Sequence, residues 1–362
     1  MSIEIPETMK AIVLTSPGQH ELQTVPVPKP GPYEVLSRVR AVAICGSDPE
    51  IFSGVQAGFW PPSYPFIAGH EWAGEVVAVG EGVNDLKPGD RVAGEPHKGC
   101  GFCENCKAGR YTLCMNYGKP ETGHKHYGFI NQGAYAQYAV HANKTLTRMP
   151  DHVSFAEGSM CDTAGVSLHG LELTGVTPGG TTVIIGPGPI GLIAMRLAKA
   201  MGAAKVIMVG RRSRLEAAQR LGADAVVDFE KVEPVEAVRA LTGGRGVDEA
   251  FECSGAVGTM TQAIRMVKKG GKVSLIGVPA DSKMMEAVPF HYIVHNEILV
   301  TGSRADPNTM WKAMGMMASG ALNVKDLITH HFPIERYEEA LDVFIHRKEN
   351  AVKVVIEPNG EE

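Results

Sequence analysis

Residues 181–191 have the sequence TTVIIGPGPIG, and this stretch decides the fold of the second half of the chain. Its first five residues are all β-branched, as in a short buried strand. Three glycines follow at once, and the next residues have the length and apolar content of a helix. A glycine loop between a strand and a helix permits a tight turn, close approach of a pyrophosphate and close packing of the helix. We therefore expect a dinucleotide site at this helix N-terminus, formed by Gly186, Gly188, Pro189, Ile190 and Gly191.

Helices and strands alternate from this loop onward. After the first helix, strands are predicted at 205–210, 225–229, 247–252 and 272–277, with helices at 214–221, 235–241 and 260–267. Strands separated by helices of this length form parallel βαβ units. The sequence therefore predicts an α/β domain built on a doubly wound parallel sheet, of the Rossmann type.

The chain before this region has a different character. β-branched runs at 11–15, 35–44, 72–79 and 134–140 are separated by Pro and Gly turn signals, which predicts an irregular β-rich domain. A last predicted strand at 351–356 could pair back with this domain. We assign residues 1–159 and 300–362 to the β-rich domain and residues 160–299 to the dinucleotide-binding domain.

Composition limits the possible functions. The chain has 362 residues, 44% apolar content and a net charge of -5, and its basic residues are scattered. This favours a globular two-domain protein and argues against a nucleic-acid or anionic-membrane partner. No signal peptide is expected, and no apolar stretch reaches the roughly 18 residues of a membrane span. Seven cysteines, four of them clustered, favour reduced thiols that hold metal, so we expect a cytoplasmic protein.

The four clustered cysteines lie in CGFCENCKAGRYTLC, at Cys100, Cys103, Cys106 and Cys114. Four thiolates at this spacing match a closed tetrahedral zinc site. Such a site leaves no position for a substrate. We expect a structural zinc here.

The end of the second predicted strand bears on the choice between NAD and NADP. NAD sites usually have an acid there, whereas NADP sites have a small residue and a nearby arginine. This chain has Gly210, Arg211 and Arg212, which favours NADP, with Arg211 as the leading phosphate contact. Alternatively, both arginines belong to a solvated loop tip and the protein uses NAD through other groups.

Four further residues are candidate metal ligands: Cys45, His70, Glu71 and Asp162. A catalytic zinc takes mixed Cys, His and carboxylate ligands and keeps one position open. Taken alone, Cys45 is more often a small buried hydrophobe, and His70 with Glu71 is more often a surface pair. Spacing alone cannot bring them together.

The order of motifs points to a known family. CGSD, GHE running into GEVVAVGEGV, KPGDRV, the cysteine string, GAYAQY, GPGPIG and FECSG occur here in one order. In this the chain resembles the zinc-dependent medium-chain alcohol and polyol dehydrogenases over nearly its whole length. It is most similar to the sorbitol and threonine dehydrogenase branch, although VGRR is similar to NADP-dependent secondary-alcohol members. The resemblance implies a GroES-like catalytic domain beside the Rossmann domain.

The resemblance also implies roles for particular residues. Cys45, His70 and Asp162 would surround a catalytic zinc, and Glu71 would be a ligand or a reserve ligand. Cys161 is a less favoured alternative to Asp162. Ser47 would pass the proton of a bound alcohol toward solvent. Many relatives end this relay with a histidine where this chain has Glu50, so Glu50 is either the terminal base or a solvated acid.

We therefore predict an enzyme with two zinc ions per chain, one catalytic and one structural, and with NADP rather than NAD as the favoured cofactor. It would transfer a hydride between the cofactor and a secondary alcohol or polyol, or the matching ketone, and would form a homodimer or homotetramer. One alternative is a regulatory protein that keeps the fold but has lost turnover. Another is a zinc-free reductase of the quinone-reducing type, which should lack both the cysteine cluster and the GHE pair.

Overall fold

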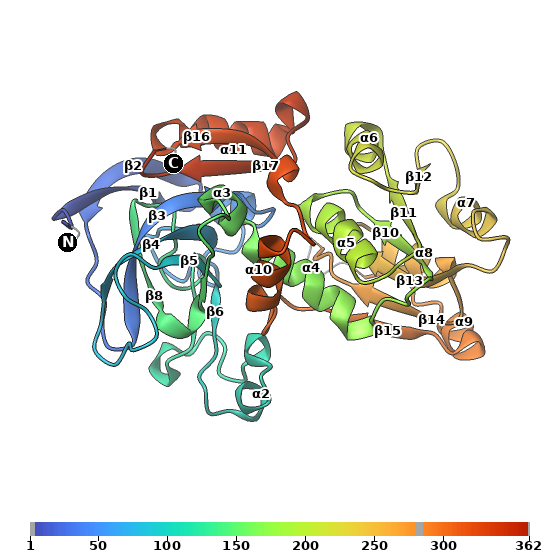
Figure 1. Cartoon of the computed structure of the whole chain (residues 1–362), viewed down its shortest axis with the longest axis horizontal. Helices are drawn as coiled ribbons and strands as arrows, with labels where there is room; N and C mark the ends of the chain where they lie inside the picture. Colours follow the sequence, from blue (N-terminus) through green and yellow to red (C-terminus); the bar gives the residue numbers. More distant parts are fainter. Residues whose placement is uncertain (1–3, 280–284, 361–362) are drawn as a thin grey trace. The chain divides into compact units, whose positions relative to one another are not determined.

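The computed structural model describes residues 4–279 and 285–360, and the chain divides into two compact units. The β-rich unit contains Met1–Asp162, Met310–Ser319 and Val324–Glu362. The α/β unit contains Thr163–Thr309 and Gly320–Asn323. Figure 1 colours both units by sequence position. No helix among the described residues is long and apolar enough to cross a membrane.

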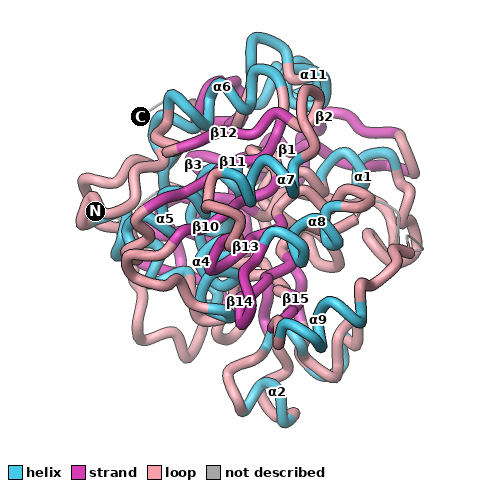
Figure 2. The backbone as a smooth tube through the Cα atoms, turned by 90° about the vertical axis from the view of Figure 1, so that its right-hand side faces the viewer, coloured by secondary structure: helices cyan, strands magenta, loops and turns pink. Residues whose placement is uncertain are grey.

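A six-stranded sheet forms the centre of the α/β unit. Its spatial order is β12-β11-β10-β13-β14-β15, and every pairing is parallel. The strands are β10 (Thr181–Ile185), β11 (Lys205–Gly210), β12 (Ala225–Asp228), β13 (Val247–Glu252), β14 (Val267–Leu275) and β15 (Leu299–Gly302). Numbered within the unit, this is the order 3-2-1-4-5-6 of a dinucleotide-binding sheet. Figure 2 shows these strands side by side.

Helices cover both faces of this sheet. They are α4 (Cys161–Thr174), α5 (Pro189–Ala200), α6 (Arg212–Arg220), α7 (Pro234–Ala240), α8 (Thr259–Met266) and α9 (Phe290–Asn296). Figure 1 shows α5 and α6 on one side and α7, α8 and α9 on the other. The inner strands β10, β11 and β13 are buried on both faces, which explains their apolar sequences. The predicted doubly wound α/β fold is confirmed.

The β-rich unit contains a seven-stranded sheet. Six strands have the order β16-β17-β3-β4-β5-β9, and β8 also pairs with β3. They are β3 (Glu34–Ala43), β4 (Glu71–Val79), β5 (Arg91–Gly94), β8 (Tyr138–Ala142), β9 (Leu146–Arg148), β16 (Ile328–Pro333) and β17 (Lys353–Glu357). Two smaller sheets pair β1 (Thr8–Ser16) with β2 (Gln19–Pro26), and β6 (His97–Lys98) with β7 (Lys125–His126).

The helices of this unit are short. They are α1 (Asp48–Ser53), α2 (Glu104–Lys107), α3 (Phe155–Ser159), α10 (Met310–Ala318) and α11 (Tyr337–His346). Six 3₁₀ turns accompany them: η1 (Tyr111–Leu113), η2 (Pro120–Thr122), η3 (Asn143–Thr145), η4 (Lys325–Leu327), η5 (Ile334–Arg336) and η6 (Lys348–Asn350). The core between sheet and helices includes the fully buried Trp72 and Tyr135.

The C-terminal strand joins the N-terminal part of the sheet, as the sequence predicted. In β17, Val355 pairs with Ala43 and Ile356 with Val42 of β3, antiparallel. On its other side β17 pairs with β16 in parallel. Lys353, on the same strand, therefore lies close to the loop that follows β3.

Candidate functional site

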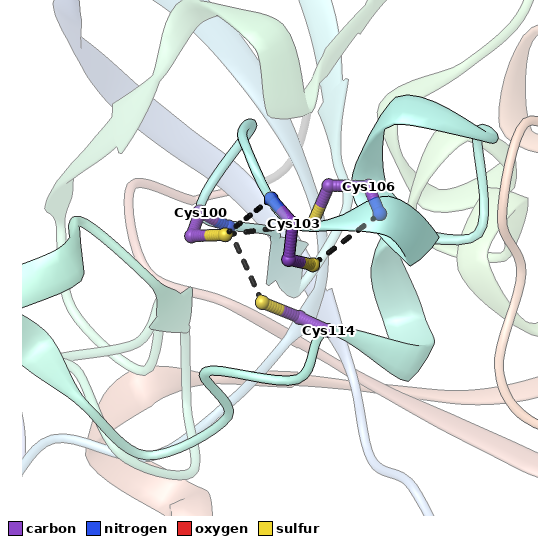
Figure 3. Close-up of side chains that lie close together, drawn as sticks. All are labelled: Cys100, Cys103, Cys106 and Cys114. Carbon is purple, nitrogen blue, oxygen red and sulfur yellow. Dashed lines mark hydrogen bonds between the residues drawn. The ribbon is translucent and has the colours of Figure 1, made fainter.

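The four clustered cysteines meet around one point. Their sulfur atoms all lie within 4.8 Å of one another. Figure 3 shows Cys100, Cys103, Cys106 and Cys114 converging from the loop around α2. We call this group the cysteine cluster.

Backbone N–H groups turn toward the sulfurs of the cysteine cluster. The N–H of Cys103 donates to Cys100 Sγ at 3.5 Å, and that of Cys106 donates to Cys103 Sγ at 3.5 Å. Cys100 N–H donates to Cys114 Sγ at 3.4 Å. Such donors stabilise thiolates, which are the form that binds metal.

The thiols of this cluster differ in acidity. Burial opposes ionisation of Cys100, but hydrogen bonds from Asn116 and from the N–H groups of Cys103 and Phe102 lower its pKa to about 6. Burial, and then contact with the neighbouring thiols, raises the pKa of Cys106 to about 12. A divalent cation removes this conflict because it deprotonates the thiols that it binds. Four sulfurs in a closed group fit zinc.

A second group of possible ligands contains Cys45, His70 and Glu71, whose ligand atoms also lie within 4.8 Å of one another. We call it the mixed cluster. The register of the sheet brings it together, since Ala43 at the end of β3 pairs with Glu71 at the start of β4. His70 and Glu71 are both buried. The surface-pair interpretation of His70 and Glu71 is therefore wrong.

Lys353, from β17, neutralises part of this cluster. Its ammonium forms an ion pair with Glu71 Oε2, and both side chains are only 2% exposed. Burial works against a charged lysine, but the Glu71 carboxylate and then Cys45 raise the pKa of Lys353 overall. Sequence reasoning missed Lys353, which is far from the other residues along the chain.

Asp48 lies on the other side of the mixed cluster and is fully buried. Its Oδ2 accepts hydrogen bonds from the Cys45 N–H and the Tyr135 hydroxyl, each at 2.7 Å. Its Oδ1 lies 3.8 Å from His70 Nδ1. A carboxylate facing one ring nitrogen orients a histidine whose other nitrogen binds metal.

The mixed cluster is rich in groups that become anionic. Burial, and then the Glu71 carboxylate, raise the pKa of the Cys45 thiol. Burial also raises the pKa of Asp48, against the opposing effect of His70. A thiol and two carboxyl groups thus face one ammonium. This donor set fits a bound divalent cation, which would stabilise the thiolate.

Asp162 lies at the start of α4 and is also buried, but it is not among the three residues of the mixed cluster. Its charge reaches Glu95, a second buried acid. Burial raises the pKa of Glu95 well above its usual value, a hydrogen bond from Tyr111 opposes this rise, and Asp162 adds to it. The neighbouring Cys161 donates to the Met310 carbonyl at 3.3 Å. The ligand role of Asp162 stays a prediction.

Ser47 and Glu50 follow Cys45 closely. Ser47 is the residue before α1, yet its hydroxyl makes no capping hydrogen bond to that helix. It lies close enough to Cys45 to lower the pKa of that thiol slightly, against the larger effect of burial. Glu50 Oε2 accepts a hydrogen bond from the Gln56 amide at 3.1 Å.

The glycine loop has the close contacts that a dinucleotide site requires. Gly186 has a φ of 99°, in the region that favours glycine. A Cβ on Gly191 would lie 2.0 Å from the carbonyl oxygen of Gly186, so only glycine lets α5 begin so close to β10. A Cβ on Gly188 would lie 3.7 Å from Arg214 Nη1, so the guanidinium of Arg214 lies beside the loop. Sequence reasoning missed Arg214, although it is the third arginine of the segment GRRSR.

Gly210, at the end of β11, packs against Pro187 of the glycine loop. A Cβ on Gly210 would lie 2.5 Å from Pro187 Cγ, so packing alone explains a glycine at this position. Arg211 and Arg212, here called the arginine pair, both contact Glu230. The solvated loop tip proposed as an alternative is therefore ordered by ion pairs.

Comparisons with known proteins agree with this arrangement. A family model described as "Alcohol dehydrogenase GroES-like domain" matches residues 31–151, and one described as "Zinc-binding dehydrogenase" matches residues 189–319. Sorbitol dehydrogenase of Bacillus subtilis (strain 168) is 36% identical over 360 residues, which cover 99% of this chain and 100% of that protein. D-arabitol-phosphate dehydrogenase of Enterococcus avium is 34% identical over 98% of this chain and 99% of that protein.

Solved structures give the same result. A zinc-binding dehydrogenase of Sinorhizobium meliloti 1021 bound to NADP is similar with a TM-score of 0.88 and 33% identity, covering 98% of this chain and 100% of that one. The fold and the two ligand groups define a two-domain, zinc-dependent oxidoreductase that uses a nicotinamide cofactor. The chain belongs to the medium-chain alcohol and polyol dehydrogenase family, as its motifs predicted. The comparisons do not favour a regulatory protein without turnover or a zinc-free reductase.

Proposed function

We propose that this enzyme interconverts a polyol, or a polyol phosphate, and the corresponding ketone, with transfer of a hydride to or from NADP. The mixed cluster is the observation that supports this most directly. The sulfur of Cys45, the imidazole of His70 and the carboxylate of Glu71 lie within 4.8 Å of one another. All three residues belong to the segment that matches the GroES-like domain model. The names of the relatives above supply the substrate class.

Zinc held by Cys45, His70 and Asp162 would act as a Lewis acid that lowers the pKa of the substrate hydroxyl. Asp48 Oδ1 lies 3.8 Å from His70 Nδ1 and would orient this ring if the two atoms approached to hydrogen-bond distance. Glu71 lies in the mixed cluster while its Oε2 is paired with Lys353, and it would be either a fourth ligand or a reserve ligand. A second zinc in the cysteine cluster would stabilise the loop around α2.

Ser47 Oγ would take up the proton released from the substrate hydroxyl. Its hydroxyl is available because it does not cap α1. Glu50 would receive the proton at the end of the relay. Replacement of Glu50 by Gln should change the pH profile of turnover, and an unchanged profile would leave Glu50 as the acid that holds Gln56.

The preference for NADP rests on the arginine pair and on the NADP-bound structure of a relative. Gly210 gives it less support than the sequence suggested, because Pro187 already requires a small residue there. Comparison of kcat/KM with NADP and NAD tests the preference. A tenfold preference for NAD would contradict it.

We also propose a homo-oligomer formed through β15, the edge strand of the α/β sheet. Leu299 on this strand is 51% exposed, and Phe290 and Val294 of the preceding helix are 74% and 60% exposed. An uncovered edge with apolar neighbours is a pairing surface. Light scattering should find a dimer or tetramer. All seven cysteines are free thiols, which supports a reducing, cytoplasmic location.

Two measurements test the function itself. Metal analysis of the purified protein should find two zinc ions per chain. Turnover should be found in a panel of polyols, polyol phosphates and their ketones tested with both cofactors. One zinc per chain and no turnover with any member would instead favour a protein whose catalytic site is silent.

A further inference from the structure

Glu230 is bound by both residues of the arginine pair. Arg211 Nη1 donates to its Oε1 at 2.9 Å. Arg212 binds it with two donors, Nη2 to Oε1 at 2.9 Å and Nε to Oε2 at 3.2 Å. Three guanidinium N–H groups therefore converge on one carboxylate.

The sheet fixes Glu230 in this place. Gly210 at the end of β11 pairs with Asp228 at the end of β12, and the Phe229 N–H donates to the Gly210 carbonyl at 3.2 Å. The Glu230 N–H then donates to Asp228 Oδ1 at 3.0 Å. Glu230 thus follows the strand that neighbours β11, directly opposite the arginines.

The backbone of Arg212 has an unusual conformation beside Glu230. Its φ is 52°, in the left-handed region that non-glycine residues rarely adopt. Its two hydrogen bonds to Glu230 offset the cost of this conformation. The Arg212 hydrogen bonds, and then those of Arg211, lower the pKa of Glu230, so the carboxylate is ionised near neutral pH.

A carboxylate and a phosphate compete for the same guanidinium donors, because both accept paired N–H groups in one plane. The end of β11 is where a dinucleotide sheet receives the 2′-phosphate of NADP. The side chains remain open to solvent here, with 46%, 71% and 35% of Arg211, Arg212 and Glu230 exposed. A phosphate group can therefore reach the arginines.

We propose that Glu230 is an internal competitor of the 2′-phosphate, and that NADP binding displaces its carboxylate from the arginine pair. NAD, which has no 2′-phosphate, leaves the contacts between Glu230 and the arginine pair in place. Glu230 thereby reduces the margin by which the protein favours NADP and keeps NAD usable. This inference rests on the proposed NADP preference and deepens it.

Glu230→Gln tests the proposal. The amide keeps the shape of the side chain but removes the charge that competes with phosphate. NADPH and adenosine 2′,5′-bisphosphate should each bind about three- to tenfold more tightly, as expected for the loss of exposed ion pairs. The dissociation constants of NADH and AMP should change less than about twofold, and the gain for NADPH should shrink at high salt. Fluorescence titration and calorimetry provide these constants.

Glu236→Gln is the matched control, since it removes the same charge from the exposed surface of α7. It should leave all four dissociation constants unchanged. Weaker NADPH binding by Glu230→Gln would overturn the proposal and show that Glu230 positions the arginines. Weaker NADH binding would overturn it in favour of a carboxylate that binds the ribose, and no change in any constant would also overturn it. The NADP preference itself is judged on the wild-type protein, so its failure is distinguishable from these results.

Discussion

The cysteine cluster and the mixed cluster are built in opposite ways. The first gathers four identical possible ligands from one short loop, Cys100 to Cys114, which contains little regular structure. The second brings three different possible ligands, Cys45, His70 and Glu71, together at the ends of β3 and β4, next to the buried side chains of Asp48 and Lys353. The group of thiols depends on the conformation of a single loop. The residues of the mixed cluster, and Lys353 beside them, come together only when β17, β3 and β4 pair in the sheet.

The largest expected effect comes from removing a ligand of the mixed cluster. Cys45→Ala should lower kcat/KM by about 10³-fold or more, since a Lewis acid contributes several kcal/mol to the transition state. Zinc content should fall from two ions per chain to one. The control is Cys253→Ala, a cysteine outside both clusters, which should keep both ions. Retention of two zinc ions by Cys45→Ala would contradict the assignment.

Disruption of the buried ion pair should mainly affect stability. Lys353→Met leaves Glu71 as a buried, unpaired acid and should lower the free energy of unfolding by about 3–5 kcal/mol. The double variant with Glu71→Gln should recover part of this loss, because the uncompensated charge is gone. Chemical denaturation of the two variants measures the difference. Equal stability of the single and double variants would show that the pair is not coupled.

Removing a thiol of the cysteine cluster should lower stability and leave activity almost unchanged, in contrast to Cys45→Ala. Cys106→Ser should lower the melting temperature by about 6–12 °C, corresponding to about 3 kcal/mol for a weakened structural zinc. At 25 °C, kcat should stay within about twofold of wild type, because a metal held by four thiolates has no open position for a substrate. Calorimetry and initial rates measure both quantities. A loss of kcat as large as that of Cys45→Ala would remove the distinction between the clusters.

The smallest effect concerns a buried histidine outside both clusters. His141 lies between the rings of Trp72 and Tyr127, and burial lowers its pKa to about 3. Below pH 6.5 the unfolded chain binds a proton that the folded protein does not bind, so stability falls as the pH decreases. At pH 5.5 this loss is about 1.4 kcal/mol relative to pH 8. His141→Phe should remove that part of the pH dependence, as measured by urea denaturation at both pH values. An unchanged difference between the two pH values would show that His141 does not contribute.

The sequence predicted the α/β sheet closely because buried parallel strands are strongly apolar and each is followed by a helix. Strand β2 (Gln19–Pro26) was not predicted, since its polar sequence gives no clear alternation. Its pairing with β1 depends on tertiary structure.

The residues of the candidate site were predicted unevenly for a similar reason. Ligand types and motif order pointed to Cys45, His70 and Asp162, with Glu71 as a ligand or reserve ligand, whereas the structure groups Glu71 rather than Asp162 with the first two. Lys353 could not be found, because only the register of β17 against β3 brings it to Glu71. Glu230 was missed because it follows the strand beside the arginines rather than their own strand.

The position of β17 also has a consequence for biosynthesis. The cysteine cluster is complete once residue 114 has been made, so its loop can bind metal while the chain is still growing. Lys353 belongs to β17, the last strand among the described residues, which pairs with β3. During translation the Glu71 carboxylate therefore lacks this partner until residue 353 has been made. The mixed cluster therefore cannot reach its final form before β17 has been made and has paired with β3.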